Sequence, residues 1–195
     1  MEFDKVKSNR GKVINDLLLC IPNAFSDSRG VFFESWNKNI FDKVVGKNIN
    51  FVQDNQSSSV KGVLRGLHYQ LDPYPQGKLV RCINGEIFDI AVDIRKKSAT
   101  FGEWSGVYLN DSNKKQFWIP EGFAHGFLTM SSSAIVLYKT TNYWEKDLER
   151  SILWNDQSIG IDWPLSFLNK KNPLLSKKDT MALDFETIIR KSEVF

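Results

Sequence analysis

The sequence contains little cysteine and no long apolar run, and both shortages restrict the kind of protein it encodes. Cys20 and Cys82 are the only cysteines among 195 residues, too few for a disulfide scaffold. The first residues lack the apolar stretch of a secretory signal, and the aliphatic run at 17–20 is far shorter than a membrane span. We therefore expect a reduced, soluble protein of the cytoplasm that does not bind membranes.

The sequence also lacks a strong excess of charge of either sign. Its formal net charge is +3, and lysine and arginine are interspersed with acidic residues. This pattern does not suggest a nucleic-acid partner, although a few arginines would suit a phosphorylated ligand. The hydrophobic content of 42% excludes a disordered chain, and the length fits one globular domain over residues 1–195.

Strand signals dominate the middle of the chain. Runs of β-branched and aromatic residues, separated by short turn-rich segments, predict strands at 31–36, 51–56, 62–70, 104–109, 115–119, 123–130 and 134–140. This spacing is typical of an all-β sandwich or barrel. We therefore predict a mainly β fold with few helices.

The dipeptide Asn84-Gly85 is the strongest turn signal in the sequence. It divides the β-rich run at 78–94, and such a dipeptide favours a two-residue type I′ hairpin. In that hairpin Val80 would pair with Asp89. Asp89 would also lie diagonally across from Lys78, close enough for an ion pair.

Two helices are predicted outside the strands. Apolar residues at helical spacing indicate a helix at 37–45, and Gly46 offers a left-handed stop. Near the end of the chain, Ser176 and Asp179 have the spacing of a capping box that opens a short helix.

A series of sequence blocks resembles one known family. The blocks are DSRGVFFES (27–35), FVQDNQS (51–57), GVLRGLHYQ (62–70), QGKLVRCINGEIFDIAVDIRKKSATFG (76–102), FWIPEGFAHGF (117–127), LYKTTNYW (137–144), ILWNDQSIGIDWP (152–164) and LLSKKD (174–179). Together they make the chain similar to the dTDP-4-dehydrorhamnose 3,5-epimerases, enzymes of deoxysugar nucleotide biosynthesis. The resemblance implies a double-stranded β-helix, a jelly-roll barrel of the cupin type, with short helices at 165–195.

Many cupins bind a metal through a His-x-His pair, a carboxylate and a later histidine. Here His68 and His125 are the only histidines and lie far apart in the sequence. A site with two imidazoles would need carboxylates at a spacing that the sequence does not contain. We therefore expect a cupin that uses no metal, and the resemblance implies no other cofactor.

The resemblance also implies catalytic roles for four residues. His68 would remove a proton next to a ketone, and Asp179 would orient its imidazole. Lys78 would stabilise the enolate oxygen, and Tyr138 would return a proton from the opposite face. Simpler alternatives remain open, because Asp179 suits the capping box and Lys78 suits an ion pair with Asp89.

Arg65 and His125 match family positions that contact the sugar nucleotide. Residues three apart on a regular strand point to opposite faces, so Arg65 and His68 converge only if Gly66 permits a bulge or bend. We predict that irregularity. For His125 the alternative is a hydrogen-bonded core residue.

In the family the N-terminal segment crosses to the neighbouring subunit, which implies a homodimer. The residues that would complete the partner's nucleotide pocket are Arg29, Glu34, Gln53 and Asn55. The alternative for 27–30 is an ordinary turn before a strand.

One substrate-binding position departs from the family. The family commonly has two tyrosines where this chain has Tyr143 followed by Trp144. An indole can stack on a thymine ring, but it has no phenolic proton to give. The departure leaves open whether one carbon or two is inverted.

The leading hypothesis is an epimerase that inverts C3 and C5 of dTDP-4-dehydro-6-deoxyglucose, giving the precursor of dTDP-rhamnose. One alternative is a related enzyme that epimerises C3 only or shifts the ketone. A noncatalytic sugar-binding cupin is a third hypothesis, and a metal-dependent cupin oxygenase is a fourth.

Overall fold

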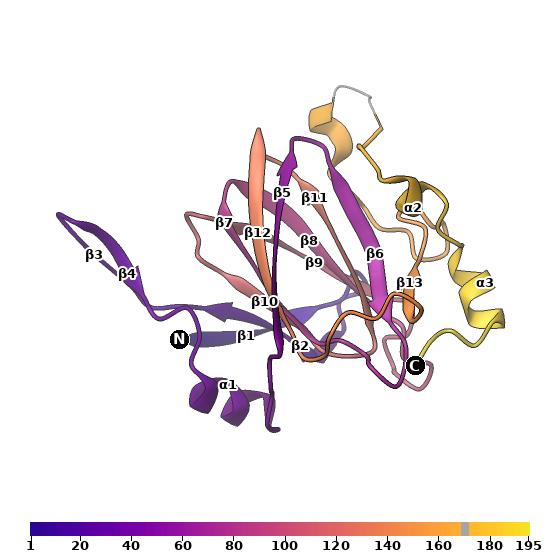
Figure 1. Ribbon diagram of the computed structural model, residues 1–195, viewed down its shortest axis with the longest axis horizontal. Helices are drawn as coiled ribbons and strands as arrows, with labels where there is room; N and C mark the ends of the chain where they lie inside the picture. The colour runs from indigo at the N-terminus through magenta and orange to yellow at the C-terminus, as the bar shows by residue number, and fades with distance from the viewer. Residues whose placement is uncertain (169–171) are drawn as a thin grey trace.

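Two antiparallel sheets packed against each other make up most of the protein in the computed structural model, which describes residues 1–168 and 172–195 (Figure 1). The first sheet has the order β1 (Glu2–Lys7), β2 (Val13–Ile21), β10 (Gln116–Ile119), β7 (Lys78–Asn84), β12 (Ser133–Thr140) and β5 (Gln53–Val60). The second has the order β13 (Glu149–Ser151), β6 (Leu64–Gln70), β11 (Phe123–Thr129), β8 (Glu86–Asp93) and β9 (Trp104–Asn110). The predicted mainly β fold is confirmed.

Buried apolar side chains from both sheets fill the space between them, and their removal from water stabilises the barrel. This core includes Leu17, Val80, Ile87, Phe117, Phe127 and Val136. The outer face of the second sheet is also covered, because Ile90 and Leu128 pack against Trp163 and Phe185 of the C-terminal segment. Strand β8 is therefore buried on both faces.

From β5 to β13 the chain passes repeatedly from one sheet to the other. Strands β5, β7, β10 and β12 belong to the first sheet, whereas β6, β8, β9, β11 and β13 belong to the second. This alternation is the double-stranded β-helix that the resemblance implied. Because adjacent segments of the chain lie on opposite walls, residues close in sequence can face each other across the interior.

The Asn84-Gly85 dipeptide makes a turn, but the predicted hairpin is wrong. Strand β7 pairs with β10 and β12, and β8 pairs with β9 and β11. Gly85 has a φ of 76°, and a Cβ there would lie 2.1 Å from the Ser133 carbonyl oxygen, so this turn requires glycine. Both edges of each strand are already paired within its own sheet, so the turn carries the chain between sheets.

Because the hairpin does not form, the contacts predicted from its strand register also differ from those in the structure. The predicted ion pair between Lys78 and Asp89 does not form among the described residues; Asp89 pairs with His125 at 2.6 Å, although its negative charge still acts on Lys78. Val80 and Asp89 are not ladder partners; Val80 pairs with residues of β10 and β12. Val80 and Ile87 still meet in the barrel core, but they approach it from opposite sheets.

Helix α1 (Lys38–Val45) confirms the early helix. The side chain of Asn37 caps its first turn, and Gly46 ends it in the left-handed conformation with a φ of 77°. Phe41 is fully buried and lies edge-on to Trp118 on β10, with ring centroids 5.2 Å apart. The helix therefore packs against the first sheet.

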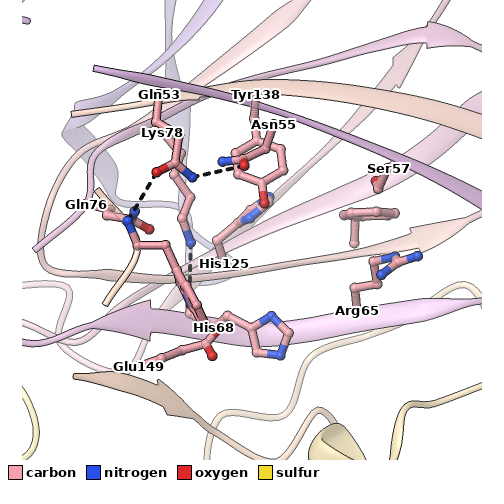
Figure 2. Close-up of a pocket in the computed structure, with 12 residues that line it drawn as sticks. Gln53, Asn55, Ser57, Arg65, His68, Gln76, Lys78, His125, Tyr138 and Glu149 are labelled. Atoms are coloured by element: carbon pink, nitrogen blue, oxygen red, sulfur yellow. Dashed lines mark hydrogen bonds between the residues drawn. The ribbon is translucent and has the colours of Figure 1, made fainter. Parts of the chain in front are cut away.

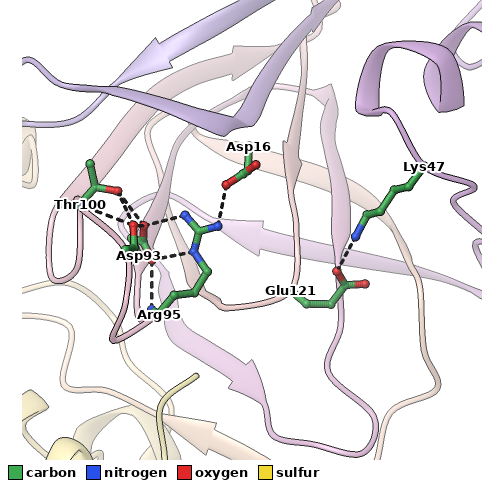
Figure 3. A network of polar contacts seen from close by, with 7 residues as sticks. Asp16, Lys47, Asp93, Arg95, Thr100 and Glu121 are labelled. Atoms are coloured by element: carbon green, nitrogen blue, oxygen red, sulfur yellow. Dashed lines mark hydrogen bonds and ion pairs between the residues drawn. The ribbon is translucent and has the colours of Figure 1, made fainter.

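The turn after β8 joins the N-terminal strands to the barrel (Figure 3). Buried Asp93 accepts hydrogen bonds from Arg95, Ser98 and Thr100. Arg95 also pairs with Asp16 on β2 at 2.6 Å. Strand β2 pairs with β10, so β1 and β2 extend the first sheet of this barrel, and exchange of N-terminal strands with a dimer partner stays a prediction.

A two-stranded hairpin of β3 (Ala24–Asp27) and β4 (Gly30–Phe33) projects away from the barrel (Figure 1). The strand predicted at 31–36 therefore ends at Phe33. Apolar side chains on this hairpin are exposed, namely Phe25, Val31 and Phe32.

Short helices follow the barrel, as predicted for 165–195. They are η1 (Leu165–Leu168), α2 (Lys177–Thr180) and α3 (Phe185–Arg190), whereas 169–171 lie outside the described residues. Ser176 caps α2 by accepting the backbone N–H of Asp179. None of the helices in the described part of the chain has the length and apolar character needed to cross a membrane.

Candidate active site

One cavity of about 190 Å³ opens between the two sheets, and most of the predicted site residues line it (Figure 2). Its lining comes from β5, β6, β7, β11 and β12, from the loop before β7, and from the segment that leads from β12 into β13. The lining residues are Gln53, Asn55, Ser57, Arg65, His68, Gln76, Lys78, His125, Phe127, Tyr138, Trp144 and Glu149.

The irregularity predicted at Gly66 is present. Gly66 has a φ of 129°, and the pairing of β6 with β11 shifts register between His125 and Phe127. A Cβ on Gly66 would lie 2.5 Å from the Cα of Gly126, so no other residue fits without displacing β11. As a result, Arg65 and His68 line the same cavity although they are three residues apart.

His68 and Asp179 are in contact. The Nε2 atom of His68 lies 2.5 Å from Oδ1 of Asp179, and the Ser176 hydroxyl donates to the other carboxylate oxygen at 2.7 Å. The carboxylate of Asp179 therefore bridges the hydroxyl of the capping serine and the imidazole of His68. Burial lowers the pKa of His68, while Asp179 opposes this effect.

The carboxylate of Asp179 is suited to remain ionised. Burial alone would raise its pKa, but the hydrogen bonds from His68 and Ser176 outweigh burial and lower the pKa of Asp179. An ionised partner holds one ring nitrogen of His68 and leaves the other available to a ligand.

Lys78 is a buried ammonium at the centre of the cavity wall. Only 7% of the residue is exposed, and its Nζ donates to the carbonyl oxygen of His68 at 3.2 Å. Burial lowers the pKa of Lys78 to about 8, although the negative charges of Glu149 and Asp89 oppose the change. Lys78 is therefore a cation at neutral pH that loses its charge under mildly basic conditions.

Tyr138 enters the cavity from the sheet opposite His68. It lies on β12 of the first sheet, whereas His68 lies on β6 of the second. In the view of Figure 2, the side chains of Lys78 and His125 lie between those of Tyr138 and His68. Burial raises the pKa of Tyr138, with Arg65 opposing and Glu149 adding to the increase. The phenol therefore keeps its proton at neutral pH.

His125 is a hydrogen-bonded core residue, as one of its two predictions states, and it also reaches the cavity. It is only 8% exposed and its Nε2 lies 2.6 Å from Oδ1 of Asp89, yet it also lines the cavity. Asp89 is fully buried, and within the described residues its Oδ2 has no hydrogen-bond partner. Burial raises the pKa of Asp89, while His125 opposes the increase.

The four residues assigned to the partner's pocket divide into two groups. Gln53 and Asn55 line the cavity of their own chain and are hydrogen-bonded to each other at 3.0 Å. Arg29 and Glu34 do not line this cavity. Arg29 instead pairs with Asp27 in the turn of the projecting hairpin.

Four lining residues were missed by the sequence interpretation. Ser57, Gln76 and Phe127 lie inside the family-like blocks, but nothing in the sequence distinguished them from structural residues. Glu149 lies between two blocks, and its place becomes clear only in three dimensions. It forms an ion pair with Lys178 at 2.6 Å, next to Asp179.

The fold and this cavity define the class of protein, and comparisons with known proteins agree. The family model described as dTDP-4-dehydrorhamnose 3,5-epimerase matches residues 12–187. The dTDP-4-dehydrorhamnose 3,5-epimerase of Shigella flexneri is 59% identical over 88% of this chain and 92% of its own length.

Solved structures extend the same comparison. A dTDP-6-deoxy-D-glucose-3,5-epimerase from Legionella pneumophila, in complex with dTDP-4-keto-L-rhamnose, has a TM-score of 0.88 and 43% identity, covering 99% of this chain and 97% of that chain. A 3′-monoepimerase from Streptomyces bikiniensis, in complex with dTDP-quinovose, has a TM-score of 0.85 and 29% identity, covering 92% and 88%.

The protein is thus a cupin-type member of the sugar-nucleotide epimerases. The chain belongs to the dTDP-4-dehydrorhamnose 3,5-epimerase family. This finding confirms the resemblance, the enzyme class and the jelly-roll barrel predicted from the sequence.

Proposed function

We propose that the protein inverts C3 and C5 of a dTDP-4-keto-6-deoxy sugar by removing and returning a proton at each carbon. The observation that supports this proposal most directly is the placement of His68 and Tyr138 on facing sheets around one cavity, with Lys78 in the wall between them. An inversion requires a base on one face of the ring and an acid on the other.

The energetics explain why three groups are needed. A carbon next to a ketone is about a dozen pKa units less acidic than an imidazolium, a gap on the order of 16 kcal/mol. No single base closes that gap, so the enolate oxygen needs preorganised positive charge. The buried ammonium of Lys78 supplies that charge without reorganising solvent.

Each residue then has one task in the proposed reaction. His68 removes the proton, and Asp179 stabilises the resulting imidazolium. Lys78 stabilises the enolate on the C4 oxygen, and Tyr138 returns a proton to the opposite face. The other lining residues bind the sugar and the nucleotide diphosphate. They include Arg65, His125, Gln53, Asn55 and Trp144.

The proposed homodimer completes the site. The projecting hairpin exposes Phe25 and Phe32 to 67% and 75%, and such side chains favour burial against another surface. A partner subunit that covers this hairpin would receive Arg29 and Glu34 at its own nucleotide pocket. The enzyme would act in the cytoplasm.

The direct test follows solvent hydrogen into the product. The purified enzyme is incubated with dTDP-4-dehydro-6-deoxyglucose in heavy water, and the product is analysed by NMR. Deuterium at both C3 and C5, with inversion at both, supports the proposal. Label at C3 alone would favour a C3-specific enzyme, and binding of the dTDP-sugar without exchange would indicate a noncatalytic protein.

A C3-specific reaction is the second candidate, because one observation favours it. Trp144 stands in the cavity wall where a tyrosine is common in the family, and an indole cannot return a proton to C5. The replacement Trp144→Tyr separates the two candidates. In a C3-specific enzyme it would introduce label at C5, whereas in a C3,C5 enzyme it leaves the labelling pattern unchanged.

We predict a bell-shaped dependence of kcat/KM on pH. His68 acts only when it is neutral, and burial lowers its pKa, so the acidic limb lies below the pKa of an ordinary histidine. Lys78 acts only when it is charged, so activity falls as pH rises through about 8. Initial rates over a pH series test this expectation, and a rate that stays level well above the pKa of Lys78 would contradict it.

A further inference from the structure

The segment 141–145 forms part of the cavity mouth without burying its own aromatic side chains. Trp144 lines the cavity yet is 51% exposed, and Tyr143 is 63% exposed. Side-chain packing therefore does little to fix this segment. Its position depends on hydrogen bonds to its backbone.

Gln70 makes the most deeply buried of these connections. It is the last residue of β6 and is only 2% exposed. Its Oε1 accepts the backbone N–H of Glu145 at 2.8 Å, and its Nε2 donates to the Tyr143 carbonyl at 2.9 Å and to the Tyr74 carbonyl. One amide thus joins the residues on both sides of Trp144 to the loop that precedes β7.

Other amides reinforce the same connection from more exposed positions. The backbone N–H of Trp144 donates to Oε1 of Gln53 at 3.2 Å. Gln76 donates to the Asn142 carbonyl at 2.8 Å, and Asn142 donates to the Pro75 carbonyl at 2.6 Å. Thr141 is joined to Gly77 and Glu121, whereas residues 142–145 are attached to their surroundings mainly through side-chain amides.

The residues proposed to do the chemistry are fixed by a different set of contacts. Tyr138 and Lys78 lie on paired strands, where Tyr138 is opposite Val80 and Lys78 is opposite Thr140. His68 is held by Asp179 and by the ladder between β6 and β11. Loosening of segment 141–145 would therefore change the cavity mouth and leave the reacting groups in place.

We propose that Gln70 is a positioning residue that determines substrate affinity by holding Trp144 over the cavity mouth. This inference rests on the proposed function, because it assigns Trp144 to the nucleotide end of a dTDP-sugar. Gln70 does not line the cavity and acts only through the backbone of segment 143–145. It is thus a determinant of binding and not of the chemical step.

The test compares Gln70→Leu with the wild type in two assays. The substitution leaves the N–H of Glu145 and the carbonyl of Tyr143 without their buried partner. We expect KM for the dTDP-sugar, and Kd for dTDP measured by calorimetry, to rise about tenfold. The value of kcat should stay near that of the wild type. If Gln70→Leu fails to fold, Gln70→Glu serves as the second variant, because it keeps the size and the acceptor oxygen and loses both donated bonds. It should likewise raise KM and Kd and leave kcat near the wild-type value.

A double-mutant cycle with Trp144→Ala shows whether the effect passes through the indole. If it does, Gln70→Leu adds little further loss of dTDP affinity once the indole is gone. Asp156→Ala is the control for a merely structural role. Asp156 is 6% exposed, accepts backbone N–H bonds from Ile159 and Phe185 and lies outside the cavity, so its loss should lower Tm without raising KM.

The outcomes separate this inference from the proposed function. Wild-type enzyme that does not bind dTDP would contradict the proposed function and, with it, the role of Gln70. Wild-type enzyme that binds dTDP, together with a Gln70→Leu variant of unchanged KM and Kd, would overturn only the role of Gln70. Additive effects of Gln70→Leu and Trp144→Ala would overturn the connection through Trp144.

Discussion

The substitution His68→Asn is expected to lower kcat by about 10³-fold, because it removes the base that starts each inversion. Asparagine has a similar size and can still hydrogen-bond to Asp179, so the cavity should keep its shape. Substrate affinity and thermal stability should change little by comparison. Steady-state conversion of the dTDP-sugar, with calorimetric binding of dTDP as the control, measures both effects.

Two other results for His68→Asn would assign His68 a different role. Loss of dTDP binding together with activity would mean that His68 holds the site together, and retention of most of the activity would assign the proton transfer to another group. Asp179 is the group nearest to His68 at 2.5 Å, but its pKa is lowered, which makes the carboxylate a poor substitute base.

The substitution Lys78→Met is expected to lower kcat by about 10²-fold to 10³-fold while leaving the protein at least as stable. The two side chains have similar lengths, but methionine supplies no charge to the enolate oxygen. Burying an ammonium costs free energy, and among the residues that the structure describes its Nζ makes one hydrogen bond, to the carbonyl of His68. Replacing a buried charge with an apolar group of similar size is often neutral or stabilising.

The substitution Lys78→Met should therefore lower kcat without lowering Tm. A variant with an unchanged or higher Tm and little activity is the expected result. A lower Tm with activity retained would mean that Lys78 supports the fold and not the reaction. Arg81, on the same strand but outside the cavity, offers a matched control in Arg81→Met, which should retain activity.

The strands were predictable because the pattern of residue types that favours a strand lies within the strand itself. Strand β12 (Ser133–Thr140) and β10 (Gln116–Ile119) fall within a residue or two of their predicted bounds. How the strands pair was not predictable in the same way. The Asn84-Gly85 turn is encoded locally, but whether it joins paired strands or opposite sheets depends on strands β10, β11 and β12, which come later in the chain.

Elements with weak periodicity were missed for a related reason. Strand β2 (Val13–Ile21) contains adjacent buried leucines, because both of its faces are covered: Leu17 packs into the barrel core and Leu18 into the cluster around α1. Strand β13 (Glu149–Ser151) has only three residues and exists through its pairing with β6. Neither carries the alternation that predicts a strand.

The residues that line the cavity were easier to predict than the topology, because the resemblance to a known family implies most of them. His68 and His125 are the two histidines of the chain. Residues three apart on a regular strand point to opposite faces, so convergence of Arg65 and His68 predicted the irregularity at Gly66. Glu149 and Gln70 were not predictable as site residues, since a glutamate or glutamine acquires such a place only from the loops folded against it.

The most direct test of the central claim, that base and acid act from opposite faces of one sugar ring, is the heavy-water experiment on Tyr138→Phe. His68 is intact in this variant, so it should still exchange the C3 proton for deuterium, while inverted product forms at least about 10²-fold more slowly than in the wild type. Exchange without inversion would place His68 and Tyr138 on opposite faces. Inverted product at the wild-type rate would contradict the account, because the proton would then come from a group other than Tyr138.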